Sequence, residues 1–366
     1  MIGIFTTHVS ENAPKLVASL LATTFLSEGK LVAEFEKSLA TQLGIMNPIA
    51  VNSGTSALHL AVLLADVRLG DEVILPAQTF IASGLAIKYA GATPVFADIN
   101  YQTGNIDPMS IRRNITNKTK AIMAVHWAGL PCDMSEIHDI ANEFKIPVIE
   151  DAAHALGATY KGQPVGTLSD FTCFSFQAIK HVTTGDGGAI AFRNNAIAYN
   201  ARCLRWFGID KSATPLSILG ERVYNVDEIG YKYHLNDYSA ALGLANLCEF
   251  PKRLQRIRSI AWRYRKEFHN LSGIELWQTP SDRESACWLF GMHVAKREEF
   301  IRALHSRGVT ASVVHQRIDR NSVFGGVRQD LVNQARFDET QIHIPLHSSL
   351  TDEDVEQVIS AVKKGW

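Results

Sequence analysis

The sequence predicts an α/β protein: a mainly parallel seven-stranded sheet sandwiched by helices, followed by a smaller α/β C-terminal domain. From residue 48 to about residue 192, short β-branched runs alternate with helical stretches of roughly a dozen residues, which is the pattern of βαβ units. Beyond Asp237 this rhythm gives way to long helical stretches with a few strands. The 366 residues amount to about two and a half domains of typical size, which favours one large domain with a smaller partner.

Seven apolar runs are the candidate strands of the large sheet. They occupy residues 48–51, 72–75, 93–97, 120–126, 146–150, 171–175 and 188–192. Between them, three segments carry apolar residues three and four positions apart and are predicted helices, at 55–68, 79–90 and 134–145. Because helices cover both faces of a parallel sheet, its strands are expected to be apolar throughout.

The C-terminal part is expected to mix helices with a few strands. A helix is predicted over 238–248, and Pro251 suits the first turn of a new helix whose cationic residues form its solvated side. Further strands are predicted at 289–294 and 343–345, and further helices at 297–307 and 352–363. We therefore expect a large domain over residues 12–249 and a small one over 250–366, with residues 1–11 associated with the small domain.

Charge and composition exclude several classes of protein. Thirty-six Lys and Arg against 37 Asp and Glu give a formal net charge of -1, without the basic excess of a nucleic-acid binder. Five cysteines without a CxxC pair argue against a disulfide framework and a zinc site, so no metal is expected. The first residues lack the pattern of a secretory signal, and no window approaches 18 uninterrupted apolar residues. These features predict a cytoplasmic protein without a membrane span.

A phosphate site is predicted where the first strand meets its helix. Ser53, Gly54 and Thr55 follow strand 48–51 and open the helix. A glycine at this turn lets backbone N–H groups approach a ligand, and the free amides and dipole of a helix start attract phosphate. Taken alone, the same residues are also an ordinary helix cap and turn.

A carboxylate is predicted at the end of the fifth strand. The apolar run 146–149 leads into Glu150 and Asp151, which places Asp151 at the carboxyl end of a parallel strand, where α/β sheets bind ligands. A largely buried carboxylate there needs a cation or an N–H partner. The alternative is that Asp151 caps the next helix and that His154 is a packed histidine.

Lys180 lies in a loop between the strand that ends at Ser175 and the glycine-rich turn at 185–188. A lysine flanked by buried segments is suited to a lowered amine pKa and to forming a Schiff base. The alternative, a solvated loop lysine, leaves the glycine turn and the two upstream sites unexplained. A phosphate anchor, an acid and an amine together are what pyridoxal 5'-phosphate (PLP) requires: the acid keeps the pyridinium nitrogen protonated and the amine forms the imine.

Nine segments spread over nearly the whole chain form an ordered set: SEGKLVAEFEKSLA, VNSGTSALHLAV, GDEVILPAQTFIAS, GATPVFADI, VHWAGLPCDM, VIEDAAHALGATYKGQPVG, FSFQAIKHVTTGDGG, RWFGID and GYKYHLNDYSAALGLANL. This set resembles the DegT/DnrJ/EryC1/StrS family of PLP-dependent nucleotide-sugar aminotransferases, which have the aspartate aminotransferase fold. The resemblance implies that Lys180 binds PLP covalently and moves protons, that Asp151 pairs with the pyridinium nitrogen, and that His154 lies near the ring.

The resemblance also implies how the rest of the cofactor is held. Gly54, Thr55 and Ser175 would hold the phosphate, and Phe80 would stack on the pyridine ring unless it is a core phenylalanine. Where the family often has an asparagine from the neighbouring subunit, this chain has Lys232, a cation that suits a phosphate of the cofactor or of the substrate. Sharing this motif between subunits implies at least a homodimer.

The implied reaction transfers an amino group from L-glutamate to a nucleotide-linked keto sugar, in surface-polysaccharide or secondary-metabolite biosynthesis. His126, Trp206, His315 and Arg317 lie in segments that resemble the substrate side of the family, where aromatic and arginine side chains suit a base and a diphosphate. Substrates with a 3-keto group, a 4-keto group or a ketocyclitol stay open.

Two other functions compete with transamination. Related sugar dehydratases carry histidine in place of the lysine, and here the adjacent pair is Lys180-His181. Lys180 lies five residues after Ser175 and seven before Gly187, as in the aminotransferases, which favours transamination. A binding or regulatory protein that has lost turnover is the third possibility, because a fold does not imply a function.

Overall fold

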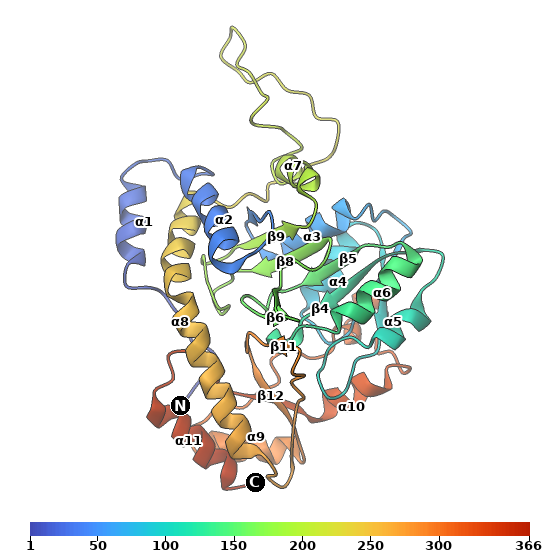
Figure 1. Cartoon of the computed structure of the whole chain (residues 1–366), viewed down its shortest axis with the longest axis vertical. Helices are drawn as coiled ribbons and strands as arrows, with labels where there is room; N and C mark the ends of the chain where they lie inside the picture. Colours follow the sequence, from blue (N-terminus) through green and yellow to red (C-terminus); the bar gives the residue numbers. More distant parts are fainter.

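A seven-stranded sheet forms the centre of the computed structural model, which describes all 366 residues (Figure 1). The strand order is β1-β9-β8-β5-β4-β2-β3, and only β9 runs antiparallel to its neighbours. The strands are β1 (Ile49–Val51), β2 (Glu72–Pro76), β3 (Thr93–Ala97), β4 (Thr119–Val125), β5 (Val148–Asp151), β8 (Phe171–Ser175) and β9 (Gly188–Phe192). All seven strands expected from the sequence are present, and the predicted fold class is confirmed.

Helices cover both faces of this sheet, which explains its apolar strands. In β2, Val73 and Leu75 pack into the core under α3, α4 and α7, while Ile74 between them packs into the core under α5 and α6. On that second face, α2 and the first half of α8 form a further core with β8 and β9. The covering helices are α2 (Lys30–Leu43), α3 (Gly54–Leu64), α4 (Ile81–Tyr89), α5 (Pro108–Asn114), α6 (Met134–Phe144) and α7 (Asn195–Leu204).

A second, antiparallel sheet organises the C-terminal part, with β12 paired to both β10 and β13. The N-terminus joins this part, because Ile2 forms a parallel bridge with Val309. A third small sheet, β11-β6-β7, links the two parts of the chain. The elements are β6 (Thr159–Tyr160), β7 (Gln163–Pro164), β10 (Ile274–Leu276), β11 (Arg283–Glu284), β12 (Phe290–Val294), β13 (Gln341–Ile344), α9 (Arg297–Ser306), α10 (Val332–Thr340) and α11 (Asp352–Lys363), with short 3-10 turns η1 (Trp127–Gly129), η2 (Ile318–Arg320) and η3 (Ser322–Phe324).

One long helix, α8 (Asp237–Phe268), connects the two parts, with α1 (Ala13–Leu21) beside its first half (Figure 1). The expectation that Pro251 starts a new helix was wrong: the proline lies inside α8. The helix continues because one apolar stripe runs through it, Phe250 and Leu254 packing on the large sheet and Ile257 on the C-terminal core. The expected boundary at residues 249 and 250 falls within α8 and stays a prediction.

All five cysteines are free thiols. None of the helices combines the length and the apolar character that crossing a membrane requires.

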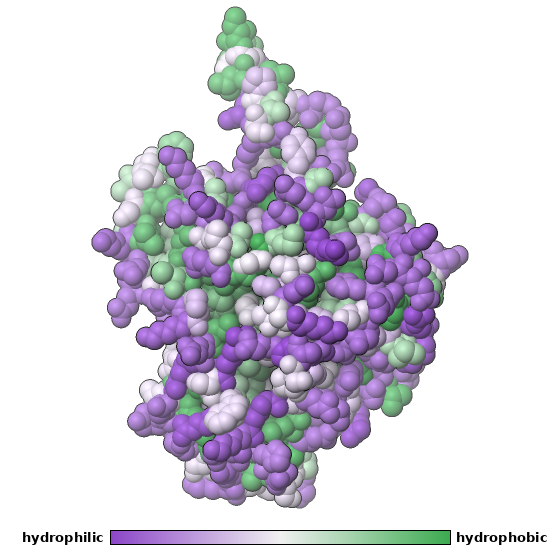
Figure 2. Space-filling view, in the orientation of Figure 1, coloured by the Kyte–Doolittle hydropathy of each residue, from purple (hydrophilic) through white to green (hydrophobic).

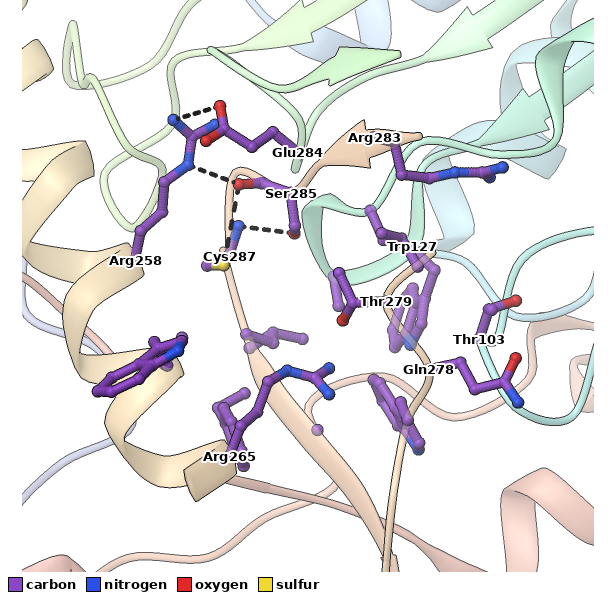
Figure 3. A pocket seen from close by; sticks show the side chains of 18 residues that line it. Thr103, Trp127, Arg258, Arg265, Gln278, Thr279, Arg283, Glu284, Ser285 and Cys287 are labelled. Carbon is purple, nitrogen blue, oxygen red and sulfur yellow. Dashed lines mark hydrogen bonds and ion pairs between the residues drawn. The ribbon is translucent and has the colours of Figure 1, made fainter. Parts of the chain in front are cut away.

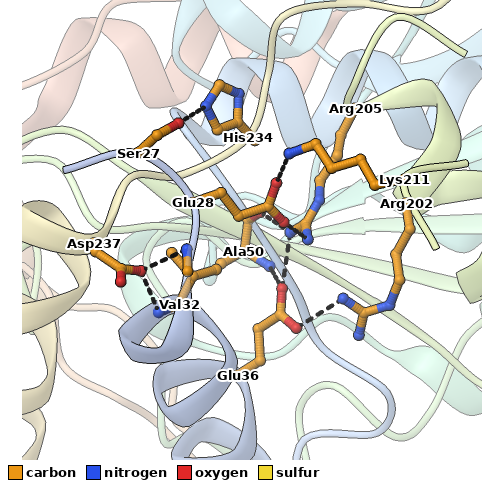
Figure 4. Close-up of polar contacts among 11 residues, drawn as sticks. Ser27, Glu28, Val32, Glu36, Ala50, Arg202, Arg205, Lys211, His234 and Asp237 are labelled. Atoms are coloured by element: carbon orange, nitrogen blue, oxygen red, sulfur yellow. Dashed lines mark hydrogen bonds and ion pairs between the residues drawn. The ribbon is translucent and has the colours of Figure 1, made fainter. Parts of the chain in front are cut away.

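A buried arginine ties the N-terminal helices to the large sheet (Figure 4). Arg205, at the end of α7, donates hydrogen bonds to Glu36 on α2 at 2.8 Å and to the carbonyl oxygen of Ala50 on β1 at 2.6 Å, and it also pairs with Glu28. Arg202, one turn earlier, pairs with the other oxygen of Glu36 at 2.9 Å but is half exposed. Both arginines thus bind the Glu36 carboxylate, but Arg205 is buried whereas Arg202 is half exposed.

Replacing Arg205 with methionine is expected to destabilise the protein by about 3 kcal/mol, because Glu36 and Glu28 lose their buried cation and keep only the more exposed Arg202 and Lys211. The matched variant Arg202→Met is expected to cost less than about 1 kcal/mol, since its side chain is 49% exposed. Urea denaturation of both variants at one protein concentration measures the difference. Equal costs would show that burial of Arg205 contributes nothing.

Candidate active site

A cavity of about 370 Å³ opens at the carboxyl ends of β5 and β8, beside the start of α3. Eight residues singled out from the sequence line it together, although they are up to 261 positions apart between Gly54 and His315: Gly54, Thr55, Phe80, Asp151, His154, Ser175, Lys180 and His315. The parallel strands bring them together because their carboxyl ends share one edge of the sheet.

Asp151 is the last residue of β5 and is 6% exposed. Its carboxylate accepts hydrogen bonds from the Ser83 hydroxyl at 2.7 Å and from the backbone N–H of Ala153 at 3.2 Å. Burial raises the pKa of Asp151, while these two hydrogen bonds and the charge of Lys180 act against that rise. The carboxylate is therefore held rigidly, with capacity left for a cationic partner in the cavity. No feature of the sequence points to Ser83, which reaches Asp151 from α4 only in the folded chain.

Lys180 projects into the same cavity from the loop after β8. Its Nζ atom lies 3.7 Å from the centroid of the Trp288 ring, a cation–π contact. Burial lowers the pKa of Lys180 to about 7, and the charge of Asp151 opposes this shift. At neutral pH a large fraction of the amine is thus unprotonated, the form that attacks a carbonyl and accepts a proton.

The pH dependence of this amine can be measured directly. In cofactor-free protein, the rate at which PLP becomes covalently attached is expected to rise with pH and to reach its midpoint near pH 7, because only the neutral amine reacts. Stopped-flow absorbance across a pH series gives this midpoint. A midpoint near pH 10, the value of a solvated lysine, would contradict the effect of burial.

The start of α3 forms the opposite end of the cavity. The Ser53 side chain caps the helix by accepting from the N–H of Ser56 at 3.0 Å. The N–H groups of Gly54 and Thr55 belong to the first turn of the helix and therefore have no acceptor within it. A Cβ atom on Gly54 would lie 2.9 Å from the Cβ of Ser175, so only glycine permits this close approach. Free amides, a helix dipole and two hydroxyls suit a phosphate here.

His154 forms part of one wall of the cavity, and Trp288 packs behind it. The Trp288 ring lies parallel to the His154 ring, with centroids 3.7 Å apart, and its indole N–H donates to the carbonyl oxygen of Ile179 at 3.1 Å. Burial and the charge of Lys180 lower the pKa of His154 well below its usual value, so its imidazole is neutral. Its Nδ1 atom is buried without a partner, which leaves it for a ligand's polar group. Trp288 could not be identified from the sequence, because it lies directly before an apolar strand and belongs to no recognisable motif.

Phe80 lies across the cavity mouth, at the N-cap of α4. Its side chain is 52% exposed and its ring centroid is 5.1 Å from that of His315. It is therefore not the core phenylalanine of the alternative interpretation, and it is free to cover a planar ligand.

Two expected substrate residues, His126 and Arg317, do not line the cavity of this chain. His126 is fully buried, with Nε2 2.7 Å from a Glu150 oxygen and Nδ1 accepting from the N–H of Cys132 at 3.1 Å. Arg317 is 4% exposed and binds both oxygens of Asp319, at 2.7 and 2.5 Å. Both ring nitrogens of His126 and the Nε and Nη2 groups of Arg317 are used in structural hydrogen bonds, and neither residue lines the cavity.

Trp206 and Lys232 also lie outside the cavity of their own chain. They contact each other, with the Lys232 Nζ atom 3.7 Å from the Trp206 ring centroid, and the Trp206 ring packs against His234. The segment between them, residues 208–231, projects from the body of the protein as a long loop (Figure 1).

The residues of the cavity correspond to the chemical groups of PLP. The helix start with its free amides, the buried Asp151, the near-neutral Lys180 amine and the unpartnered Nδ1 of His154 match the phosphate, ring nitrogen, aldehyde and ring substituents of PLP in kind. The residues present therefore fit this cofactor.

Comparison with known proteins identifies the same family that the sequence motifs resemble. The profile described as the DegT/DnrJ/EryC1/StrS aminotransferase family matches residues 8–363. UDP-4-amino-4-deoxy-L-arabinose–oxoglutarate aminotransferase from Shewanella sediminis is 32% identical, over 97% of this chain and 96% of its own. The sugar aminotransferase CalS13 from Micromonospora echinospora superposes with a TM-score of 0.95 at 32% identity, over 100% of both chains. The PLP form of Spr1654 from Streptococcus pneumoniae also superposes on this chain, with a TM-score of 0.91 at 30% identity. The match covers 99% of this chain and 98% of the other.

Proposed function

We propose, since this chain belongs to the DegT/DnrJ/EryC1/StrS aminotransferase family and is a PLP-dependent sugar aminotransferase, that it transfers the amino group of L-glutamate to a nucleotide-linked keto sugar. The observation that carries the proposal is one cavity in which a lysine with a pKa of about 7 faces a buried aspartate and an anion-binding helix start. These groups perform different tasks in one reaction.

Lys180 holds the cofactor and moves the proton. When bound, PLP supplies a ring that stabilises negative charge on the carbon next to the amine. Asp151 keeps the ring nitrogen protonated, while Gly54, Thr55 and Ser175 hold the phosphate. Lys180 takes the proton from the α-carbon of the donor and, in the second half-reaction, delivers one to the sugar carbon that receives the amine.

Other residues that line the cavity are placed to contact the cofactor ring and the sugar. Phe80 covers one face of the cofactor ring, and neutral His154 lies at the other side, where Trp288 fixes its orientation. His315, next to Phe80, is placed to contact the sugar. Closing these rings over the site would also exclude water from the amine.

The geometry disfavours the sugar dehydratase. That reaction would need histidine in the place of Lys180, and the neighbouring His181 does not line the cavity. Its Nε2 atom instead makes a 2.8 Å hydrogen bond with the carbonyl oxygen of Ala286, and its side chain is buried. The lysine is thus the residue with access to a substrate.

The amino donor can be identified from one half-reaction. The relative from Shewanella is named for oxoglutarate, the keto acid that L-glutamate leaves behind, which supports glutamate as donor. Adding L-glutamate alone to the PLP-loaded protein is expected to bleach the absorbance of the lysine-bound cofactor and to release one 2-oxoglutarate per site. D-glutamate and L-alanine serve as controls, and a spectrum unchanged by L-glutamate would exclude it as donor. A panel of nucleotide keto sugars, assayed by mass for the amine, then tests the acceptor.

The projecting loop supports a homodimer with shared active sites. Its apolar side chains are strongly exposed: Leu216 by 65%, Ile218 fully, Leu219 by 85% and Ile229 by 79%. Figure 2 shows this apolar tip standing clear of a largely polar face. Burying it against a second copy would remove this surface from water and carry Lys232 toward the partner's site.

Complementation tests the shared site. Mixed dimers of Lys180→Ala and Lys232→Ala subunits contain one complete site, formed from the intact residue of each chain. Mixing the two inactive or weakly active homodimers under exchange conditions is therefore expected to restore activity. If the mixture is no more active than its components, Lys232 acts within its own chain or not at all.

A further inference from the structure

A second cavity, of about 340 Å³, lies between the second half of α8, the segment that leads from residue 277 to β12, and the η1 turn (Figure 3). No residue lines both this cavity and the candidate active site. It is nearly as large as the active-site cavity, and nothing in the aminotransferase reaction uses it.

Two of the three arginines around it are fully engaged. Arg258 donates to the carbonyl oxygens of Ser285 and Gly157, both at 2.9 Å, and pairs with Glu284 at 3.1 Å. Arg283 pairs with Asp282 at 2.7 Å and with Asp133 at 2.8 Å. The contacts of Arg258 join α8 to β11 and its neighbouring loop, and both guanidinium groups are paired with carboxylates.

Arg265 is different. Its guanidinium extends from α8 into the cavity and makes no hydrogen bond or ion pair with the protein, and Figure 3 shows it pointing into open space between the walls. The expectation that the charges of this helix face solvent is therefore wrong for Arg265, whose pKa burial lowers. Arg265 is only partly exposed, and its guanidinium stays charged at physiological pH. A charge that is partly removed from water and has no partner in the protein is stabilised when an anion accompanies it.

The walls show what kind of anion would fit. Trp127, Trp277 and Phe290 line the cavity, and Trp262 stands 66% exposed at its rim. The side chains of Gln278 and Thr279 also line it. Aromatic walls around one cation are suited to a ligand that has an apolar or planar body and a single anionic group.

We propose that this cavity binds a small organic anion, with its carboxylate or phosphate on Arg265 and its planar or apolar body between the tryptophans. The site is independent of the amino-transfer chemistry, so it would be present in the PLP-loaded enzyme during turnover.

Calorimetric titration of the PLP-loaded enzyme tests the proposal. Phenyl phosphate and phenylacetate distinguish the two anionic groups, and 2-phenylethanol is the neutral probe of similar shape. We expect saturable binding of at least one anion, binding at least tenfold weaker in Arg265→Met, and an intermediate affinity in Arg265→Lys. Arg193→Met, which changes an exposed arginine after β9, is the matched control and should bind as the wild type does.

Thermal unfolding separates ligand binding from a structural role. Because Arg265→Met removes a charge without a partner, its melting temperature without added anion should equal or exceed that of the wild type. The proposal is overturned if neither anion binds, if 2-phenylethanol binds as tightly, if Arg265→Met binds with unchanged affinity, or if this variant melts well below the wild type.

Discussion

Replacing Lys180 with alanine is expected to lower kcat for amino transfer by at least about 10⁴-fold, because the variant loses the covalent attachment of the cofactor and the group that moves the proton. The amine has no substitute in the cavity: the neighbouring His181 is buried and bonded to the carbonyl oxygen of Ala286. The absorbance of the lysine-bound cofactor should disappear with the activity.

Steady-state assays and spectra of the purified variant give both quantities. Lys88→Ala, which removes an exposed lysine at the end of α4, is the control and should keep full activity. In cofactor-free protein, the melting temperature of Lys180→Ala should not fall below that of the wild type, because burial disfavours the charged form of this lysine. A Lys180→Ala variant with more than a hundredth of the wild-type rate would falsify the role assigned to the amine.

Asp151→Asn is expected to lower kcat by about 10³-fold, corresponding to roughly 4 kcal/mol, because an amide cannot keep the ring nitrogen of the cofactor protonated. The substitution preserves the shape of the side chain. Ser83 and the N–H of Ala153 donate to different oxygens of Asp151, so the amide oxygen can still accept from Ala153 while the amide NH2 donates to the Ser83 hydroxyl oxygen. The loss would therefore report charge and not packing.

Asp151→Asn is also expected to lower the pKa of Lys180. The negative charge of Asp151 raises the pKa of Lys180, so removing it lowers that pKa further below about 7. The midpoint for cofactor attachment in cofactor-free protein should accordingly move to lower pH. Ser83→Ala, which removes one hydrogen bond but keeps the charge, should leave that midpoint near 7 and reduce kcat far less. If Asp151→Asn behaves like Ser83→Ala in both measurements, the charge of Asp151 has no role in the reaction.

The fold was largely predictable because its signals are local. The seven strands were found from apolar runs such as 171–175, which a sheet buried on both faces requires at every position. The break expected at Pro251 was wrong for a related reason: a proline costs a helix one hydrogen bond, and packing of Phe250, Leu254 and Ile257 on two cores outweighs that cost. Local signals mark where an element can end, and tertiary contacts decide whether it does.

The candidate site divides in the same way. Residues adjacent to a strand end or a helix start, such as Asp151 and Gly54, could be placed from their neighbours in the sequence. Ser83 and Trp288 could not, because nothing near them in the chain marks them as partners of Asp151 and Lys180. His126 and Arg317 show the converse: their motifs suggested substrate contacts, and in this chain they hydrogen-bond to Glu150 and Asp319 and do not line the cavity.

The sequence alone determined the family, the fold class and the three chemical groups of the proposed reaction, because each resides in a short segment whose residue types and order are visible along the chain. Only the tertiary structure decided what surrounds those groups: the burial that brings the Lys180 pKa to about 7, the serine that orients Asp151, and the second cavity around Arg265. These depend on distances between residues far apart in the chain, and burial and electrostatic energies depend on such distances in space.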